Sequence, residues 1–293
     1  MWHFFKWGSA ASPAMPVGAG VPAWVQRMRM KMVCTLTASA KTESIWIAAL
    51  GAIPLRRKGG IVLSFDDNWL EMYEIVYPLA KHYNVPTTFF WNGKAIETHT
   101  DPLKVTKAQA IEMATDPSGM CCIGNHGWEH VDLFSMTAAE YCDGFDKMRD
   151  YIRTELGCAV SGDIYAYTFG HSSPAAYDEF ARRGYRAGRQ TSANYAGSRT
   201  ETFALGDRMN WVWSNIASLQ SPTTVDQVIA ACRTVGTNRS IGYILGHQVG
   251  AADTIYGWER KKIEELYARL AADRDEGLYD LWRADDIAID VGV

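Results

Sequence analysis

Short apolar runs alternate with longer amphipathic segments along the chain from residue 61 onward. Apolar runs of about 4–8 residues are typical of buried strands, whereas apolar positions every three or four residues are typical of helices. The predicted strands are Ile61–Phe65, Thr87–Trp91, Cys121–Gly124, Asp163–Tyr167, Tyr185–Gly188, Trp211–Trp213 and Ile241–Leu245. The predicted helices are Trp69–Tyr83, Lys107–Thr115, Ala138–Leu156, Ala175–Arg183, Thr224–Val235 and Tyr256–Ala272. Strands that alternate with helices predict a parallel sheet with crossover helices, closed or nearly closed as an α/β barrel.

Residues 1–60 stand outside this pattern. Residues 1–24 are rich in Gly and Pro and predict irregular structure, whereas Arg27–Met32 alternates basic residues with methionines as a strand would. Thr42–Leu50 has the pattern of a helix. We therefore expect an N-terminal extension, residues 1–60, and a catalytic domain, residues 61–293. Two long polar stretches, 92–106 and 190–210, are expected to act with the extension as capping loops over the site.

Polar clusters follow four of the predicted strands. Asp66 and Asp67 follow the first strand, His126 and His130 follow the third, and His247 follows the last. A fourth cluster, Phe169-Gly170-His171, comes after Asp163–Tyr167. The carboxyl ends of barrel strands carry the chemistry in folds of this kind, so we expect these side chains to converge.

The two histidines are spaced i, i+4, which on a helical turn would place both rings on one side. Neighbouring side chains of a strand point to opposite faces, so Asp66 and Asp67 can have different roles. Two histidines and one carboxylate form a three-ligand set with open positions, which is typical of a catalytic metal ion. Zinc fits these ligands best, and non-haem iron is an alternative. Taken alone, an H-x-x-x-H pair or an Asp-Asp turn is more often an ordinary polar feature of a protein.

At these positions the chain resembles the polysaccharide deacetylases of carbohydrate esterase family four. Ser64-Phe65-Asp66-Asp67 is similar to the T-F-D-D motif, and His126-Gly127-Trp128-Glu129-His130 to H-[ST]-x-x-H. Leu245-Gly246-His247 matches L-x-H, and Asp207-Arg208-Met209-Asn210-Trp211 nearly matches D-x-x-D-W. The third motif matches poorly, because Ala166 stands where the family has Arg and only Phe169-Gly170 keeps the aromatic-Gly end. The resemblance spans about residues 60 to 290 and implies a deacetylase-type distorted (β/α) barrel.

The resemblance implies a role for each matching residue. Asp67, His126 and His130 would hold one divalent ion, zinc by preference, with Asp66 as general base and His247 as general acid. A backbone N–H near Phe169 would help to bind the oxyanion. Substrate contacts are expected from Trp128, Phe169, Gly170, His171 and Trp211. Ala166 and Asn210 remove two of the family's supporting groups. His171 is either a local substitute for the absent Arg or a surface histidine.

Composition and charge limit the kinds of binding partner and the cellular location that we expect. A net charge of −4 gives no reason to expect binding to nucleic acid. The six cysteines form no C-x-x-C pattern, and Ile45–Leu55 is too short to span a membrane. No secretory apolar region follows Met1, so a cytoplasmic protein is expected. The oligomeric state stays open.

A soluble substrate follows from that expected location. Some enzymes with this resemblance deacetylate N-acetylglucosamine on a teicoplanin-type glycopeptide antibiotic precursor. The poor third motif, the many aromatic residues and the N-terminal extension are similar to that subgroup. The prediction is therefore a metal-dependent N-deacetylase acting on a soluble glycoside or glycopeptide. Two alternatives stay open, namely a hydrolase of linear or cyclic non-sugar amides and a catalytically silent sugar-binding module.

Overall fold

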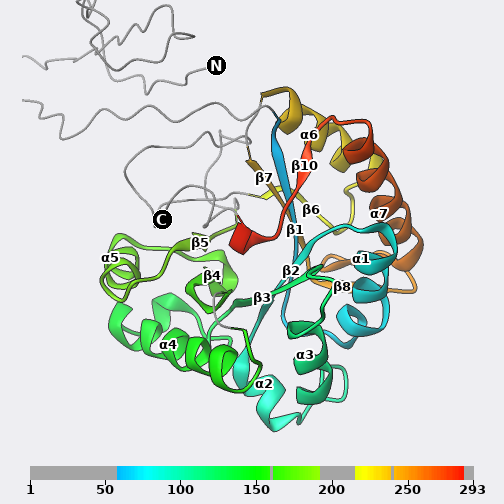
Figure 1. The fold of residues 1–293 in the computed structure, drawn as a ribbon. Coiled ribbons are helices and arrows are strands. Elements are labelled where there is room, and N and C mark those ends of the chain that lie inside the picture. Colours follow the sequence, from blue (N-terminus) through cyan, green and yellow to red (C-terminus); the bar gives the residue numbers. More distant parts are fainter. Residues whose placement is uncertain (1–57, 159–160, 192–214, 239–240, 287–293) are drawn as a thin grey trace, which may run out of the picture. The chain divides into compact units, whose positions relative to one another are not determined.

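The computed structural model describes residues 58–158, 161–191, 215–238 and 241–286 (Figure 1). The strands are β1 Gly60–Asp66, β2 Thr87–Trp91, β3 Cys121–Asn125, β4 Ile164–Ala166, β5 Ala187–Arg189, β6 Asn215–Ser218, β7 Ile241–Gly246, β8 Gln248–Gly250, β9 Gly257–Glu259 and β10 Asp280–Leu281. The helices are α1 Tyr77–Tyr83, α2 Gly93–Thr98, α3 Lys107–Ala114, α4 Ala138–Thr154, α5 Pro174–Arg182, α6 Val225–Asn238 and α7 Arg260–Asp275. A π-helical turn, Met72–Val76, precedes α1, and 3₁₀ turns lie at Leu133–Ser135, Ser161–Asp163 and Thr168–Gly170.

A parallel sheet with the order β5-β4-β3-β2-β1-β7-β6 forms the centre of the fold, and β10 pairs with the first residues of β1. Every residue of β1 and β2 is buried, as expected for strands covered on both faces. The helices follow one another around the outside of the curved sheet (Figure 1). The predicted α/β barrel fold is thus confirmed as a parallel half-barrel. Within the described ranges the sheet is open between β5 and β6 rather than closed.

Local sequence signals explain where several helices begin. Thr106 and Thr137 each form a capping box, with Gln109 and Glu140 respectively, so the free N–H groups at the starts of α3 and α4 are satisfied. A helix also forms where a polar loop was predicted, because α2 occupies part of residues 92–106. The last helix starts at Arg260 rather than Tyr256, since Gly257–Glu259 pairs with β8.

Several predictions lie outside the described residues. These are the extension up to residue 57, the strand Trp211–Trp213 and most of the loop 190–210. The boundary between extension and catalytic domain stays a prediction. In the described ranges, no helix is long and apolar enough to cross a membrane.

Candidate metal centre and active site

Strand register brings the polar clusters to one edge of the sheet. In β1 and β7, Phe65 pairs with Gly246, so Asp66 and His247 follow at the same level. In β2 and β3, Trp91 pairs with Asn125, and His126 comes next. The carboxyl ends of neighbouring parallel strands therefore present these side chains together, as the sequence predicted.

Three side chains form a compact triad. Asp67 Oδ1 lies 3.5 Å from His126 Nε2 and 3.4 Å from His130 Nε2. One ligand atom from each residue lies within 4.8 Å of the other two. His126 Nδ1 contacts the carbonyl oxygen of Ala166 at 2.8 Å. Because a carbonyl only accepts, Nδ1 carries the proton, and in the neutral ring Nε2 then presents its lone pair to the triad, which is the form of histidine that binds metals.

The triad fits a divalent ion. Ligand atoms about 2.0–2.2 Å from a tetrahedral ion lie roughly 3.3–3.6 Å from each other. The two Asp67–His separations are close to that spacing. Asp67 Oδ1 is buried and has no hydrogen-bond partner within the described part of the chain. An unpaired buried carboxylate oxygen between two imidazole rings is a donor set that could hold a metal ion, and its three residues are those predicted as ligands.

Electrostatics within the triad favour a charged Asp67. Burial raises the pKa of Asp67, but its contacts with His126, His130 and His247 outweigh this effect and hold the pKa well below its usual value. Burial lowers the pKa of His126, but the charges of Asp66 and Asp67 raise it above its usual value. Burial and the neighbouring His126 lower the pKa of His130. The carboxylate of Asp67 is thus ionised at physiological pH.

Asp66 lies beside the triad with partners of its own. Its Oδ2 is 3.9 Å from Nε2 of both His126 and His247, and it accepts a hydrogen bond from the Nη2 of Arg189. The side chain of Arg189 is only 1% exposed, and its guanidinium lies over the ring of Phe90. The sequence reasoning missed Arg189. Its signal was nevertheless present, since Arg189 directly follows the predicted strand Tyr185–Gly188.

Loops with left-handed backbone direct the ligands inward. The His126–His130 segment is irregular rather than the helical turn considered for this spacing, and Gly127 adopts φ 80°. Asp67 and Asn68 adopt φ 75° and 58°, so the chain turns directly after β1. Asn68 exchanges two hydrogen bonds with the backbone of Asn92, at 3.0 and 2.7 Å. These turns, rather than strand alternation, separate Asp66 from Asp67.

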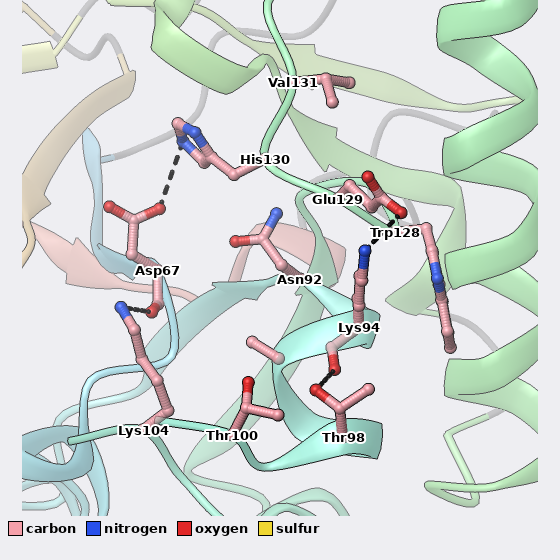
Figure 2. A pocket seen from close by; sticks show the side chains of 11 residues that line it. Asp67, Asn92, Lys94, Thr98, Thr100, Lys104, Trp128, Glu129, His130 and Val131 are labelled. Carbon is pink, nitrogen blue, oxygen red and sulfur yellow. Dashed lines mark hydrogen bonds and ion pairs between the residues drawn. The ribbon is translucent and has the colours of Figure 1, made fainter. Parts of the chain in front are cut away.

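A polar cavity opens from the triad (Figure 2). Its volume is about 510 Å³, and Asp67 and His130 form one side while Lys94 and Trp128 form the other. The remaining lining residues are Asn92, Ala95, Thr98, Thr100, Lys104, Glu129 and Val131. Lys94 pairs with Glu129 at 3.0 Å. The cavity has the size and the mixed donors and acceptors of a small-molecule site, and it includes the predicted Trp128.

Lys104 lies at the base of the triad. Its Nζ donates to the backbone oxygen of Asp67 at 2.8 Å and lies 3.2 Å from the centre of the Trp69 ring. Burial lowers the pKa of Lys104. This lysine therefore fixes the turn that carries Asp67.

The fourth predicted cluster, Phe169-Gly170-His171, lies next to His130. The ring of Phe169 is 4.4 Å from the His130 ring and 54% exposed. Phe169 has φ 55°, a conformation that costs a non-glycine residue about 1–2 kcal/mol. A Cβ on Gly170 would stand 1.8 Å from Thr191 Oγ1, which explains the aromatic-Gly pair. His171 pairs with Asp132 at 2.9 Å, whereas the place beside Asp66 belongs to Arg189. Trp211 lies outside the described residues.

A sequence model described as polysaccharide deacetylase matches residues 56–188, which contain the triad and Asp66. This match supports the assignment of the chain to the polysaccharide deacetylase family. No curated protein matches the chain.

Three of the solved structures that are similar to this chain show the likeness in fold. One is the Xyl-CE4 domain of a multidomain xylanase from the hindgut metagenome of Trinervitermes trinervoides, at 15% identity and a TM-score of 0.52. The match covers 80% of this chain and 92% of that domain. A peptidoglycan N-acetylglucosamine deacetylase has 15% identity and a TM-score of 0.51, with coverage of 78% and 90%. A Mycobacterium smegmatis protein assigned to the polysaccharide deacetylases has 13% identity and a TM-score of 0.53, with coverage of 85% and 95%. At these identities the likeness concerns the fold.

Proposed function

We propose that the protein is a metal-dependent N-deacetylase that hydrolyses the acetamide of an N-acetylglucosamine-type sugar. One observation carries the proposal: Asp66, Asp67, His126, His130 and His247 converge at one edge of the sheet, with neighbouring pairs 3.4–3.9 Å apart. Amide hydrolysis needs an activated water, a stabilised oxyanion and an acid for the leaving amine. This cluster offers a residue for each requirement.

A divalent ion held by Asp67, His126 and His130, zinc by ligand preference, would supply a polarised carbonyl and a more acidic water. Asp66 accepts the proton of the attacking water in this scheme. Its ion pair with Arg189 holds the carboxylate in a fixed orientation. His247, close to Asp66, donates a proton to the departing amine. The backbone N–H near Phe169 completes the scheme as an oxyanion donor.

The substrate side of the proposal rests on the cavity. Its hydroxyl, amide, ammonium and carboxylate groups suit the hydroxyls of a sugar, and Trp128 supplies an aromatic wall. We further propose a soluble glycosylated intermediate, such as a glycopeptide antibiotic precursor, and a cytoplasmic location. The silent-module alternative rested partly on the missing Arg of the third motif. Arg189 weakens it, because a guanidinium does lie beside Asp66.

Metal analysis and turnover measured on the same purified protein test this proposal. We expect one zinc per chain and acetate release from N-acetylglucosamine glycosides, both lost after chelation and restored by zinc. Cyclic ureides and imides serve as the comparison substrates. Turnover of these compounds without acetate release would favour the non-sugar amide hydrolase. Bound zinc without any turnover would favour the silent module.

A further inference from the structure

A row of aromatic rings leads outward from His130. Phe169 lies 4.4 Å from His130, His171 lies 6.2 Å from Phe169, and Phe134 lies 4.8 Å from His171, all measured between ring centres. The three rings beyond His130, which we name the aromatic ledge, come from the turns Leu133–Ser135 and Thr168–Gly170 and the residue after the second turn. The ledge is therefore continuous with the triad.

The ledge exposes large apolar side chains. Phe134 is 68% exposed and Phe169 is 54% exposed, both among the most exposed large apolar residues in the described part of the chain. Phe169 is held with positive φ, where strain persists only when surrounding contacts impose it. A strained residue that presents an aromatic ring to solvent beside a metal site indicates a functional surface.

Hydrogen bonds hold the ledge in place before any ligand arrives. Asp132 Oδ1 accepts from the backbone N–H of Phe134 and lies 2.9 Å from Nδ1 of His171. The hydroxyl of Thr168 donates to the backbone oxygen of Val131. The hydroxyl of Tyr141 accepts from the backbone N–H of Thr168 and lies 2.9 Å from the Thr168 hydroxyl. The two loops are thus fastened together. A preformed surface loses little freedom on binding, which favours affinity.

The chemistry of the ledge differs from that of the cavity. Lys94, Glu129 and two threonines line the cavity, where Lys94 and Glu129 also pair with each other. The ledge presents aromatic rings, and the carboxylate beside them, Asp132, is engaged by His171 and a backbone N–H. A second sugar placed on the ledge would find few partners for its hydroxyls. We propose that the aromatic ledge binds an aromatic or alkyl aglycone joined to the acetylated sugar, whose hydroxyls face the cavity. This assignment rests on the proposed function and specifies its substrate class.

The test compares methyl, octyl and naphthyl glycosides of N-acetylglucosamine, together with N,N′-diacetylchitobiose, by acetate release. The wild-type protein should prefer the naphthyl and octyl glycosides over the methyl glycoside. Phe134→Ala should reduce that preference about 10-fold, since a lost aromatic contact has an effect of this order. Ile111→Ala, which removes a side chain 37% exposed on α3, is the matched control and should keep the wild-type preference.

Equal kcat/KM for methyl and naphthyl glycosides would overturn the ledge but leave the deacetylase proposal standing. A Phe134→Ala loss confined to diacetylchitobiose would show a sugar subsite and also overturn it. If no glycoside is turned over, the proposed function fails. Calorimetric Kd values with Asp66→Asn then decide the ledge: tighter binding of the naphthyl glycoside, lost in Asp66→Asn/Phe134→Ala, supports it, and equal binding contradicts it.

A second inference comes from the pairing of β4 with β5. Ala166, where the resemblance would place an Arg, is the register partner of Arg189 on the neighbouring strand. Arg189 is buried and donates to Asp66, and its Nε and Nη1 have no hydrogen-bond partner within the described residues. The ion pair with Asp66, together with the contact with the Phe90 ring, therefore offsets part of the cost of burying this charge.

We infer that Arg189 is a positioning residue for Asp66, supplied from β5 in place of β4. Its guanidinium orients the carboxylate and keeps its charge near the reacting water. This role rests on the proposed function. The requirement is for a guanidinium beside Asp66, not for a particular strand, so an arginine placed at residue 166 should substitute for Arg189.

The test moves the arginine between the two strands. Arg189→Ala should lower kcat about 100-fold with little change in KM or zinc content, as expected when proton transfer is impaired. Ala166→Arg/Arg189→Ala should recover kcat to within about 10-fold of wild type. Acetate release by the wild type establishes the function independently. Wild-type kcat in folded Arg189→Ala, or no recovery in the folded double variant, would overturn the inference.

Circular dichroism shows which variants fold. If Arg189→Ala does not fold, a folded and active double variant supports the inference. If neither folds, Arg189→Lys decides: reduced kcat at unchanged KM supports the positioning role, because lysine lacks the planar fork, and unchanged kcat contradicts it.

Discussion

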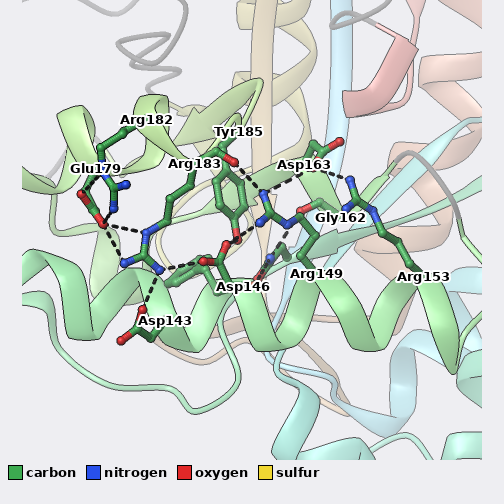
Figure 3. A network of polar contacts seen from close by, with 12 residues as sticks. Asp143, Asp146, Arg149, Arg153, Gly162, Asp163, Glu179, Arg182, Arg183 and Tyr185 are labelled. Atoms are coloured by element: carbon green, nitrogen blue, oxygen red, sulfur yellow. Dashed lines mark hydrogen bonds and ion pairs between the residues drawn. The ribbon is translucent and has the colours of Figure 1, made fainter.

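Two clusters of charged side chains show opposite designs. The first, at the carboxyl edge of the sheet, holds two aspartates and three histidines, and one oxygen each of Asp66 and Asp67 is buried without a hydrogen-bond partner in the described part. The second joins α4, α5 and the turn before β4 (Figure 3). It comprises Asp143, Asp146, Arg149, Arg153, Asp163, Glu179, Arg182 and Arg183. In this ion-pair network every charged residue has an oppositely charged partner within 2.7 Å.

The two clusters differ in whether their carboxylates are paired with cationic side chains. Arg183 binds Asp143, Asp146 and Glu179, so these carboxylates are already paired, although Nε of Arg149 is buried without a hydrogen-bond partner in the described part of the chain. At the sheet edge, carboxylate oxygens and imidazole nitrogens face one another at 3.4–3.9 Å without bonding. Carboxylate and imidazole acceptors that converge in this way are suited to binding a cation. Charge density alone therefore does not indicate a site, whereas converging unpaired acceptors do.

The largest effect is expected from removing a metal ligand. His126→Ala or His130→Ala should abolish both zinc binding and acetate release, because each removes one of three ligands. Metal content by mass spectrometry and turnover on a methyl glycoside would show this. His82→Ala, at an exposed position on α1, is the control and should keep both properties. Full zinc occupancy in the His126→Ala/His130→Ala variant would show that the triad does not bind the metal.

Loss of the proposed general acid should have the next largest effect. His247→Ala should lower kcat on an N-acetyl amide about 10²–10⁴-fold, the usual range for a proton-transfer group. The loss should be much smaller for an activated acetate ester, whose leaving group departs without a proton. Parallel kinetics on the two substrates measure the difference. An equal loss on both would assign His247 to another role.

The ion-pair network should respond in stability rather than activity. Arg183→Ala should destabilise the fold by about 1–3 kcal/mol, because Asp146 and Glu179 lose a shared partner. Thermal denaturation should show a lower Tm, while kcat and zinc content stay at wild-type values. A loss of activity in the folded variant at temperatures far below its Tm would erase the distinction between the clusters.

The smallest effect is a pH dependence within the network. Hydrogen bonds from Arg182 and then Arg183 lower the pKa of Glu179 to about 2. The unfolded value is about 4.3, so the stabilisation is complete above that pH and is lost as pH falls through about 2. The Tm difference between wild type and Glu179→Gln should be constant above about pH 5 and shrink toward pH 2. A difference that grows on acidification would contradict the sign of this shift.

Most of the fold and the residues at the centre of the candidate site could be predicted from the sequence. Apolar runs gave β2 at its observed bounds, and polar residues after strands gave Asp66, Asp67, His126 and His247. Local pattern could not give Arg189 its partner, because the contact spans 123 positions and depends on the register of β4 with β5. The helix α2 was missed, since it is short and its start has no side-chain cap. The aromatic ledge likewise depends on two loops that only the tertiary fold brings together.

We propose that the two adjacent aspartates have different roles, with Asp67 as metal ligand and Asp66 as general base. Zinc content and acetate release should be measured side by side in the wild type, Asp66→Asn and Asp67→Asn. We expect Asp66→Asn to keep one zinc per chain but to be slowed about 10²–10⁴-fold. Asp67→Asn should lose both zinc and turnover. The reverse pattern, with zinc lost in Asp66→Asn and retained in Asp67→Asn, would contradict the account.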